Sequence, residues 1–182
     1  MEILNVDIGM PIFKCKVDDH KTIKSLILNS IKDMGTFSYI TKDHRVSNTD
    51  WHLGREFDRL YYIHVEALIT KTCKDLQQYF KYKKNNIGMI NYWFQQYAKG
   101  DFHKWHTHPD SAFSCVYYVD LYNNNPATTF IINNKEFVVP VEEGTVLIFP
   151  SFLEHTSKEN KSDYTKTVIS FNLNVYGKHL GS

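Results

Sequence analysis

A series of short β-prone runs fills the second half of the chain and limits its possible folds more than any other feature. The runs are rich in Val, Ile, Phe, Tyr and Thr, and turn-forming residues such as Asn, Gly, Pro and Asp separate them. They are Met89–Tyr97, Phe113–Asp120, Thr128–Ile132, Glu136–Val141, Thr145–Phe149 and Thr165–Val175. Strands of this length and spacing predict a sheet region that closes into a sandwich or barrel.

The first half of the chain carries two helical patterns. Thr22–Met34 has apolar residues at helical spacing and is followed by Gly35, a common helix stop. A second helix is expected over about Leu60–Lys81. The polar segment Gly35–Glu56 has no clear period and is expected to be a loop or broken strand that serves as a lid. The sequence therefore predicts an α+β, mainly β domain with two N-terminal helices packed on one sheet.

Composition narrows the class of protein. A chain of 182 residues with 42% apolar residues suits a single globular domain, and a net charge of +1 gives no reason to expect nucleic-acid binding. Cys15, Cys73 and Cys115 form no Cys-x-x-Cys pair, so reduced thiols are expected. Without a signal peptide or an apolar run of membrane length, we expect a cytoplasmic protein, in the host cytoplasm if the source is viral.

Histidines cluster in the run Trp105-His106-Thr107-His108-Pro109. Residues i and i+2 of a strand face the same side, so His106 and His108 can approach one metal ion, and a later strand can deliver His155. Three ligands leave coordination positions open for chemistry. A solvated hairpin with a polar pair is the alternative.

The other histidines are weaker candidates. His103 is an odd number of residues from His106 and is expected on the opposite strand face. Surface positions are expected for His20, His44, His52, His64 and His179. Trp105 and Phe102 are expected to shield the metal site.

The segment Tyr97–His108 resembles the first ligand strand of Fe(II)/2-oxoglutarate-dependent oxygenases of the small, stand-alone, prolyl-hydroxylase-like kind. There, a Tyr-x-x-Gly run leads into a His-x-Asp pair. Later segments resemble, in order, the next core strand, the strand with the distal histidine and the final strand with a basic anchor: Ser114–Asp120, Gly144–His155 and Thr165–Asn172. The resemblance implies a double-stranded β-helix (a jelly-roll, cupin-like fold).

The resemblance also implies a division of one oxygenase domain over residues 1–182. Residues 1–86 would form a strand, the helical support and the lid loop. Residues 87–176 would form the jelly-roll catalytic core, and residues 177–182 a tail.

Site roles follow from the resemblance by position. His106 and His155 match the two histidines of the family's iron site, and His108 stands where the family has Asp or Glu. A third imidazole would make the site more positive by one charge. A competing register, His108-Pro109-Asp110, would make Asp110 the third ligand, but the step from Gly100 to His106 and the strand-breaking Pro109 favour His108.

Three further residues match cosubstrate contacts. Lys166 falls where a basic residue pairs with the distal carboxylate of 2-oxoglutarate. Tyr97 and Tyr118 match tyrosines that donate hydrogen bonds to the cosubstrate, although both would also suit a core. Ser170 and Asn172 share one strand face and are expected to line the pocket.

The activity that the resemblance implies is that of a non-haem Fe(II) dioxygenase that uses O2 and 2-oxoglutarate. It would couple oxidative decarboxylation of 2-oxoglutarate to hydroxylation of a small-molecule or peptide substrate. One alternative is a three-histidine iron dioxygenase that does not use 2-oxoglutarate, and another is a non-catalytic jelly-roll binding module. A homodimer is compatible with the sequence, and no motif names the substrate.

Overall fold

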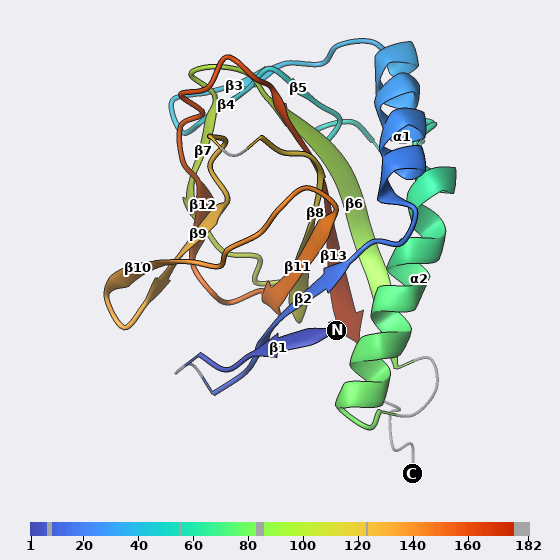
Figure 1. Cartoon of the computed structure of the whole chain (residues 1–182), viewed down its shortest axis with the longest axis vertical. Helices are drawn as coiled ribbons and strands as arrows, with labels where there is room; N and C mark the ends of the chain where they lie inside the picture. Colours follow the sequence, from blue (N-terminus) through green and yellow to red (C-terminus); the bar gives the residue numbers. More distant parts are fainter. Residues whose placement is uncertain (7–8, 55, 83–85, 123, 177–182) are drawn as a thin grey trace.

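Two antiparallel sheets face each other, and both helices cover the outer face of the larger sheet (Figure 1). The computed structural model describes residues 1–6, 9–54, 56–82, 86–122 and 124–176, so the expected tail 177–182 lies outside the described residues. The helices are α1 (His20–Met34) and α2 (Tyr62–Tyr79). Neither is long and apolar enough to cross a membrane.

The larger sheet has seven strands in the order β1-β2-β11-β8-β13-β6-β5, and the smaller has six in the order β10-β9-β12-β7-β4-β3. The strand bounds of the larger sheet are β1 (Glu2–Leu4), β2 (Ile12–Lys16), β11 (Thr145–Pro150), β8 (Phe113–Asp120), β13 (Lys166–Val175), β6 (Ile87–Tyr97) and β5 (Asn48–Thr49). Those of the smaller sheet are β10 (Lys135–Val138), β9 (Thr128–Ile132), β12 (His155–Ser157), β7 (Phe102–His106), β4 (His44–Val46) and β3 (Tyr39–Ile40). The predicted jelly-roll fold is confirmed, as two sheets that do not join into a closed barrel within the described residues.

Alternation along β8 shows how the larger sheet serves two purposes. Phe113, Cys115 and Tyr117 point outward and join the core formed with the helices, which includes Ile27 and Val65. The residues between them point the other way, toward the space between the sheets. One face of the sheet is therefore buried under the helices, and the other is available for a site.

The segment Gly35–Glu56 is more ordered than a loop. Its described residues include three short strands, of which β4 pairs with β7 of the smaller sheet and β5 pairs with β6 of the larger sheet. The prediction of a broken strand is confirmed, and the segment links the two sheets.

Turn chemistry accounts for two element boundaries. Gly35 adopts a φ of 96° and ends α1, as its sequence position predicts. Asn133 and Asn134 both have positive φ, which matches the tight hairpin between β9 and β10. That hairpin starts β10 at Lys135, and the strand ends at Val138, earlier than the expected Glu136–Val141 run.

Candidate metal centre

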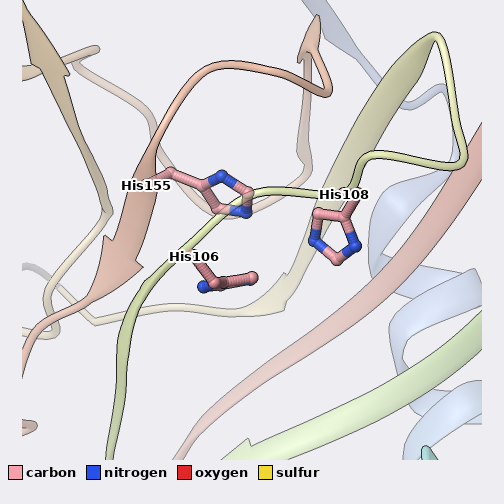
Figure 2. A group of neighbouring side chains, drawn as sticks. All are labelled: His106, His108 and His155. Atoms are coloured by element: carbon pink, nitrogen blue, oxygen red, sulfur yellow. The ribbon is translucent and has the colours of Figure 1, made fainter.

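Three histidines converge between the sheets. One ring nitrogen from each of His106, His108 and His155 lies within 4.8 Å of the others. Figure 2 shows the three rings facing a common point. His106 ends β7 and pairs directly with His155, the first residue of β12, so sheet register places these two side by side.

His108 reaches the group by a different route from the predicted one. Strand β7 ends at His106, so His108 lies on the following turn and the strand rule for residues i and i+2 does not apply. The backbone N–H of His108 donates to the carbonyl of Ser151 at 2.9 Å, and its own carbonyl accepts from Ser111. Pro109 has no N–H to continue the strand pairing. The turn, rather than the strand, therefore aims this imidazole.

Hydrogen bonds fix the tautomers of two rings. Nδ1 of His106 lies 2.9 Å from the Lys104 carbonyl, and Nδ1 of His155 lies 2.9 Å from the Leu153 carbonyl. A carbonyl only accepts, so each Nδ1 carries the proton and each Nε2 keeps a lone pair. This is the arrangement that metal-binding histidines require.

Asn172 on β13 contacts the third ring. Its side-chain amide lies 3.4 Å from Nδ1 of His108, and Ser114 donates to its oxygen at 2.9 Å. When Nε2 of His108 gives its lone pair to a metal, Nδ1 must carry a proton. The amide of Asn172 must then turn its oxygen toward the ring to accept that proton. In the observed arrangement the NH2 group of Asn172 faces Nδ1 of His108, so metal binding through Nε2 requires this amide to turn over.

Burial keeps the three rings neutral. It lowers the pKa of His106 below its ordinary value and that of His155 well below it, and it lowers the pKa of His108 to about 4. At neutral pH all three rings therefore offer lone pairs without first losing a proton.

His103 also lies beside this group, contrary to the strand-parity prediction. Its ring centroid is 4.0 Å from that of His106. In the pairing of β12 with β7, His155 lies opposite His106 and Ser157 lies opposite His103. An advance of two residues along β12 therefore corresponds to three residues along β7. This bulge adds a residue to β7 and brings His103 and His106 to the same face.

The predicted surface position of His44 is wrong as well. Pairing of β4 with β7 places His44 opposite His103, with ring centroids 4.1 Å apart. Both rings line the same cavity as the metal candidates. His20 is also less exposed than expected, because its Nδ1 lies 2.8 Å from the Tyr117 hydroxyl beneath α1.

Lys166 is buried in the wall of this cavity. Its side chain is 2% exposed, and Nζ donates to the carbonyl of Pro126 at 2.8 Å and to Oγ of Ser157 at 2.6 Å. Nζ also lies 4.5 Å from the centroid of the Tyr97 ring. No described carboxylate forms an ion pair with it. Burial lowers its pKa to about 7, so near neutral pH the charged and neutral forms coexist, and an anionic partner would stabilise the charged form.

The two tyrosines differ in what they touch. Tyr118 is buried, and its hydroxyl lies 2.8 Å from Oγ1 of Thr128 and accepts the Thr128 N–H at 3.0 Å. Tyr97 is 3% exposed and packs beneath the Lys166 ammonium. Burial raises the pKa of both, so both hydroxyls keep their protons and can donate.

One cavity of about 260 Å³ contains all these groups. The histidine group, Lys166, Tyr97 and Tyr118 line it. Ser170 and Asn172 line it as well, as their shared strand face predicts. No Asp or Glu is among the described residues that line it. Asp110, the alternative ligand, lies exposed on the turn after His108 and outside the histidine group.

The predicted shielding residues lie elsewhere. Trp105 and Phe102 line a separate hollow rather than the cavity of the histidines. In the cavity of the histidines, Trp93 and Phe149 pack against the rings instead. The ring centroid of Trp93 is 6.0 Å from that of His108, and the ring centroid of Phe149 is 4.7 Å from that of His155. Their places on β6 and β11 were predictable from strand parity, but their partner rings were not.

Comparison with solved structures identifies the fold. A viral collagen prolyl hydroxylase from Paramecium Bursaria Chlorella virus-1, in complex with 2-oxoglutarate, is 14% identical with a TM-score of 0.65, covering 93% of this chain and 98% of its own. A Pseudomonas putida prolyl-4-hydroxylase is 12% identical with a TM-score of 0.64, covering 91% and 93%. An oxygenase of the 2OG-Fe(II) family from Burkholderia pseudomallei is 12% identical with a TM-score of 0.61, covering 89% and 93%.

The chain has the fold of the 2OG-Fe(II) oxygenases. No protein-family model matches the sequence, and no curated protein has a similar sequence. The oxygenase fold is therefore established by structure, whereas the activity has to be argued from the site.

Proposed function

We propose that this protein is a non-haem Fe(II) dioxygenase that uses 2-oxoglutarate and O2 to hydroxylate a small-molecule or peptide substrate. The observation that carries the proposal is one cavity lined both by a three-histidine group and by a buried lysine that has no acidic partner among the described residues. Solved structures with the same fold include prolyl hydroxylases, one of them bound to a peptide fragment.

The donor set fits Fe(II). His106 and His155 each present Nε2 with its lone pair, since backbone carbonyls hold their Nδ1 protons. His108 completes the group from the turn, and it takes the same tautomer when the Asn172 amide turns its oxygen toward the ring. Imidazole suits iron, and three protein ligands leave positions open for further ligands. The exposed position of Asp110 supports His108 as the third ligand.

Lys166 fits the far carboxylate of 2-oxoglutarate. Its ammonium is desolvated, so a charge-assisted hydrogen bond to a carboxylate there is stronger than one in water. Ser157 and the Pro126 carbonyl fix the direction of Nζ, and the face of Tyr97 supports the charge from below. The Tyr118 hydroxyl keeps its proton and can donate to the same ligand.

The iron, when bound, would supply the oxidising chemistry, and the chain's own residues hold and orient the reactants. The histidines fix the position of the metal relative to Lys166, which sets the direction of the cosubstrate. Trp93, Phe149 and Val168 supply apolar walls that exclude water from the reacting end.

A second function deserves a test because of one observation. His108 stands at the position where the Fe(II)/2-oxoglutarate-dependent oxygenases have a carboxylate ligand. A group of three histidines would also suit an iron dioxygenase that does not use 2-oxoglutarate. The buried Lys166 supports the first function, which gives its ammonium a defined partner in the far carboxylate of 2-oxoglutarate.

Oxygen consumption separates the two. Protein reconstituted with Fe(II) is expected to consume O2 and to form succinate only when 2-oxoglutarate is present. Lys166→Met should raise the 2-oxoglutarate KM strongly, whereas Lys161→Met, an exposed lysine outside this cavity, should leave it unchanged. Oxygen consumption that ignores 2-oxoglutarate would refute the first function and favour the second.

A further inference from the structure

Aromatic side chains gather at the mouth of the cavity. Tyr39 and Trp51, here called the aromatic platform, line the cavity from the segment that links the two sheets. Trp51 is 51% exposed although it lines the cavity, so its indole lies at the opening. A ligand that enters the cavity can therefore reach this indole.

The platform has a defined geometry. The ring centroids of Tyr39 and Trp51 are 5.2 Å apart at an interplanar angle of 69°, an edge-to-face pair. Tyr39 also stacks on His52, with centroids 5.4 Å apart at 24°, and lies 6.0 Å from His44. Tyr39 is therefore held by contacts with several rings, and Trp51 packs against it.

Buried polar contacts hold the chain beneath the platform. Asp50, which is 0% exposed, accepts the Phe94 N–H and the Tyr61 hydroxyl, each at 2.8 Å. Nε of Arg59 lies 2.9 Å from the same carboxylate, and its NH2 group donates to the carbonyls of Asp50 and Leu53. The exposure of Trp51 thus belongs to an anchored segment and not to a loose one.

The charge of the cavity selects against cations. Lys166 is positive, the histidines are neutral, and no described Asp or Glu lines the cavity. With Fe(II) and the dianion of 2-oxoglutarate bound, these groups leave one net positive charge, because His108 replaces a carboxylate. Two unit positive charges at a separation of about 8 Å repel by about 2 kcal/mol at an effective dielectric constant of about 20. Cation–π attraction at an exposed ring is worth about 0.5–1 kcal/mol, so repulsion dominates.

Two uncharged polar side chains, Thr49 and Gln95, line the cavity together with the platform, and Oγ1 of Thr49 is already bonded to the Phe94 carbonyl at 2.6 Å. An anion would be drawn past them to Lys166, where the cosubstrate is proposed to bind. The mouth of the cavity therefore suits an uncharged group.

We propose that the aromatic platform selects a substrate with a flat, uncharged ring, which stacks on the exposed indole of Trp51, held by Tyr39, while the group to be oxidised points toward the histidines. This inference rests on the proposed function for the location of the chemistry. Aromatic pairs gain about 0.5–1.5 kcal/mol beyond area burial, which favours a flat ring over a saturated one by about 2- to 10-fold in affinity.

Three matched probes test the platform: benzamide, its cationic analogue benzamidine, and its saturated analogue cyclohexanecarboxamide. Binding is measured by ligand-observed NMR on protein loaded with Zn(II), a diamagnetic substitute for iron, with and without 2-oxoglutarate. Benzamide should bind about 2- to 10-fold more tightly than cyclohexanecarboxamide, and benzamidine should bind more weakly than benzamide.

Variants tie the binding to the platform. Trp51→Ala should abolish the preference for the flat ring, and Trp51→Phe should retain it. Ile40→Ala is the control, since Ile40 is an exposed neighbour of Tyr39 that does not line the cavity. No measurable benzamide binding, equal binding of benzamidine, or an unchanged preference in Trp51→Ala would each overturn the proposal. Zn(II) and 2-oxoglutarate binding are measured separately, so failure of the proposed function would not be mistaken for failure of the platform.

Discussion

Lys166 holds its ammonium among neutral oxygens in a buried position, and the proposed binding of 2-oxoglutarate should therefore depend on pH. Its pKa of about 7 in the free protein lies far below the ordinary lysine value. A bound carboxylate stabilises the charged form and raises that pKa. At pH 8 most Lys166 side chains are neutral before binding, so Lys166 must take up a proton from the solvent when 2-oxoglutarate binds.

The expected result is proton uptake that grows from near zero at pH 6 toward one proton per 2-oxoglutarate at pH 8. Affinity should fall by about tenfold per pH unit above pH 7. Calorimetric titrations in buffers of different ionisation enthalpy measure the uptake. Lys166→Arg is the control, because a guanidinium stays charged and removes this uptake. Equal uptake by Lys166→Arg and the unchanged protein would show that another group titrates.

Asn172 should matter for metal binding although it is not a ligand. Replacing it with Ala removes the amide whose oxygen, once turned toward the ring, would accept the Nδ1 proton of a metal-bound His108. Loss of such a partner lowers metal affinity by about 10- to 100-fold. Competition with a coloured chelator measures the affinity for Co(II) or Zn(II). Asn172→Asp, which keeps an acceptor, should bind more tightly than Asn172→Ala, and equal affinities would contradict the assigned role.

At the residue scale, spacing identified His106, His108 and His155 as candidates that the structure brings together. Spacing failed for His103, since a parity argument assumes an unbroken strand and β7 carries a bulge. It also failed for His44, because nothing local shows that β4 will pair beside β7.

At the scale of elements, the Asp50–Arg59 pair should stabilise the segment that links the two sheets. Asp50→Ala would leave the mostly buried Arg59 without its carboxylate and would free the donors of Tyr61 and Phe94. Removing one partner of a buried pair costs about 3–5 kcal/mol. Urea unfolding measures this loss. Asp163→Ala breaks only the exposed pair with Lys99 and should change the unfolding midpoint little. Equal effects of the two variants would rule out this role.

Strand runs and helices were predictable because their signals are local. The runs Phe113–Asp120 and Thr128–Ile132 correspond to β8 and β9 without adjustment. The segment Gly35–Glu56 was harder, since its strands of two or three residues exist only through pairing with β6 and β7. Short strands depend on distant partners, and sequence periodicity cannot reveal them.

At the scale of the whole molecule, one sheet face supports the helices and the opposite face carries the site. Sequence motifs and the structural comparisons lead independently to the same fold, even though identity to the solved structures is only 12–14% for the three described. What distinguishes this chain is His108, which gives the site three imidazoles and one more positive charge than a site with a carboxylate. The substrate proposal depends on that charge.

The most direct test of the account is an anaerobic titration with Fe(II) followed by 2-oxoglutarate, monitored by visible absorbance. We expect a charge-transfer band that saturates at one Fe(II) per chain and appears only after 2-oxoglutarate is added. His106→Ala, His108→Ala and His155→Ala should lose the band while circular dichroism shows them folded, and Asp110→Ala should keep it. A band that survives in His108→Ala but disappears in Asp110→Ala would contradict the three-histidine site.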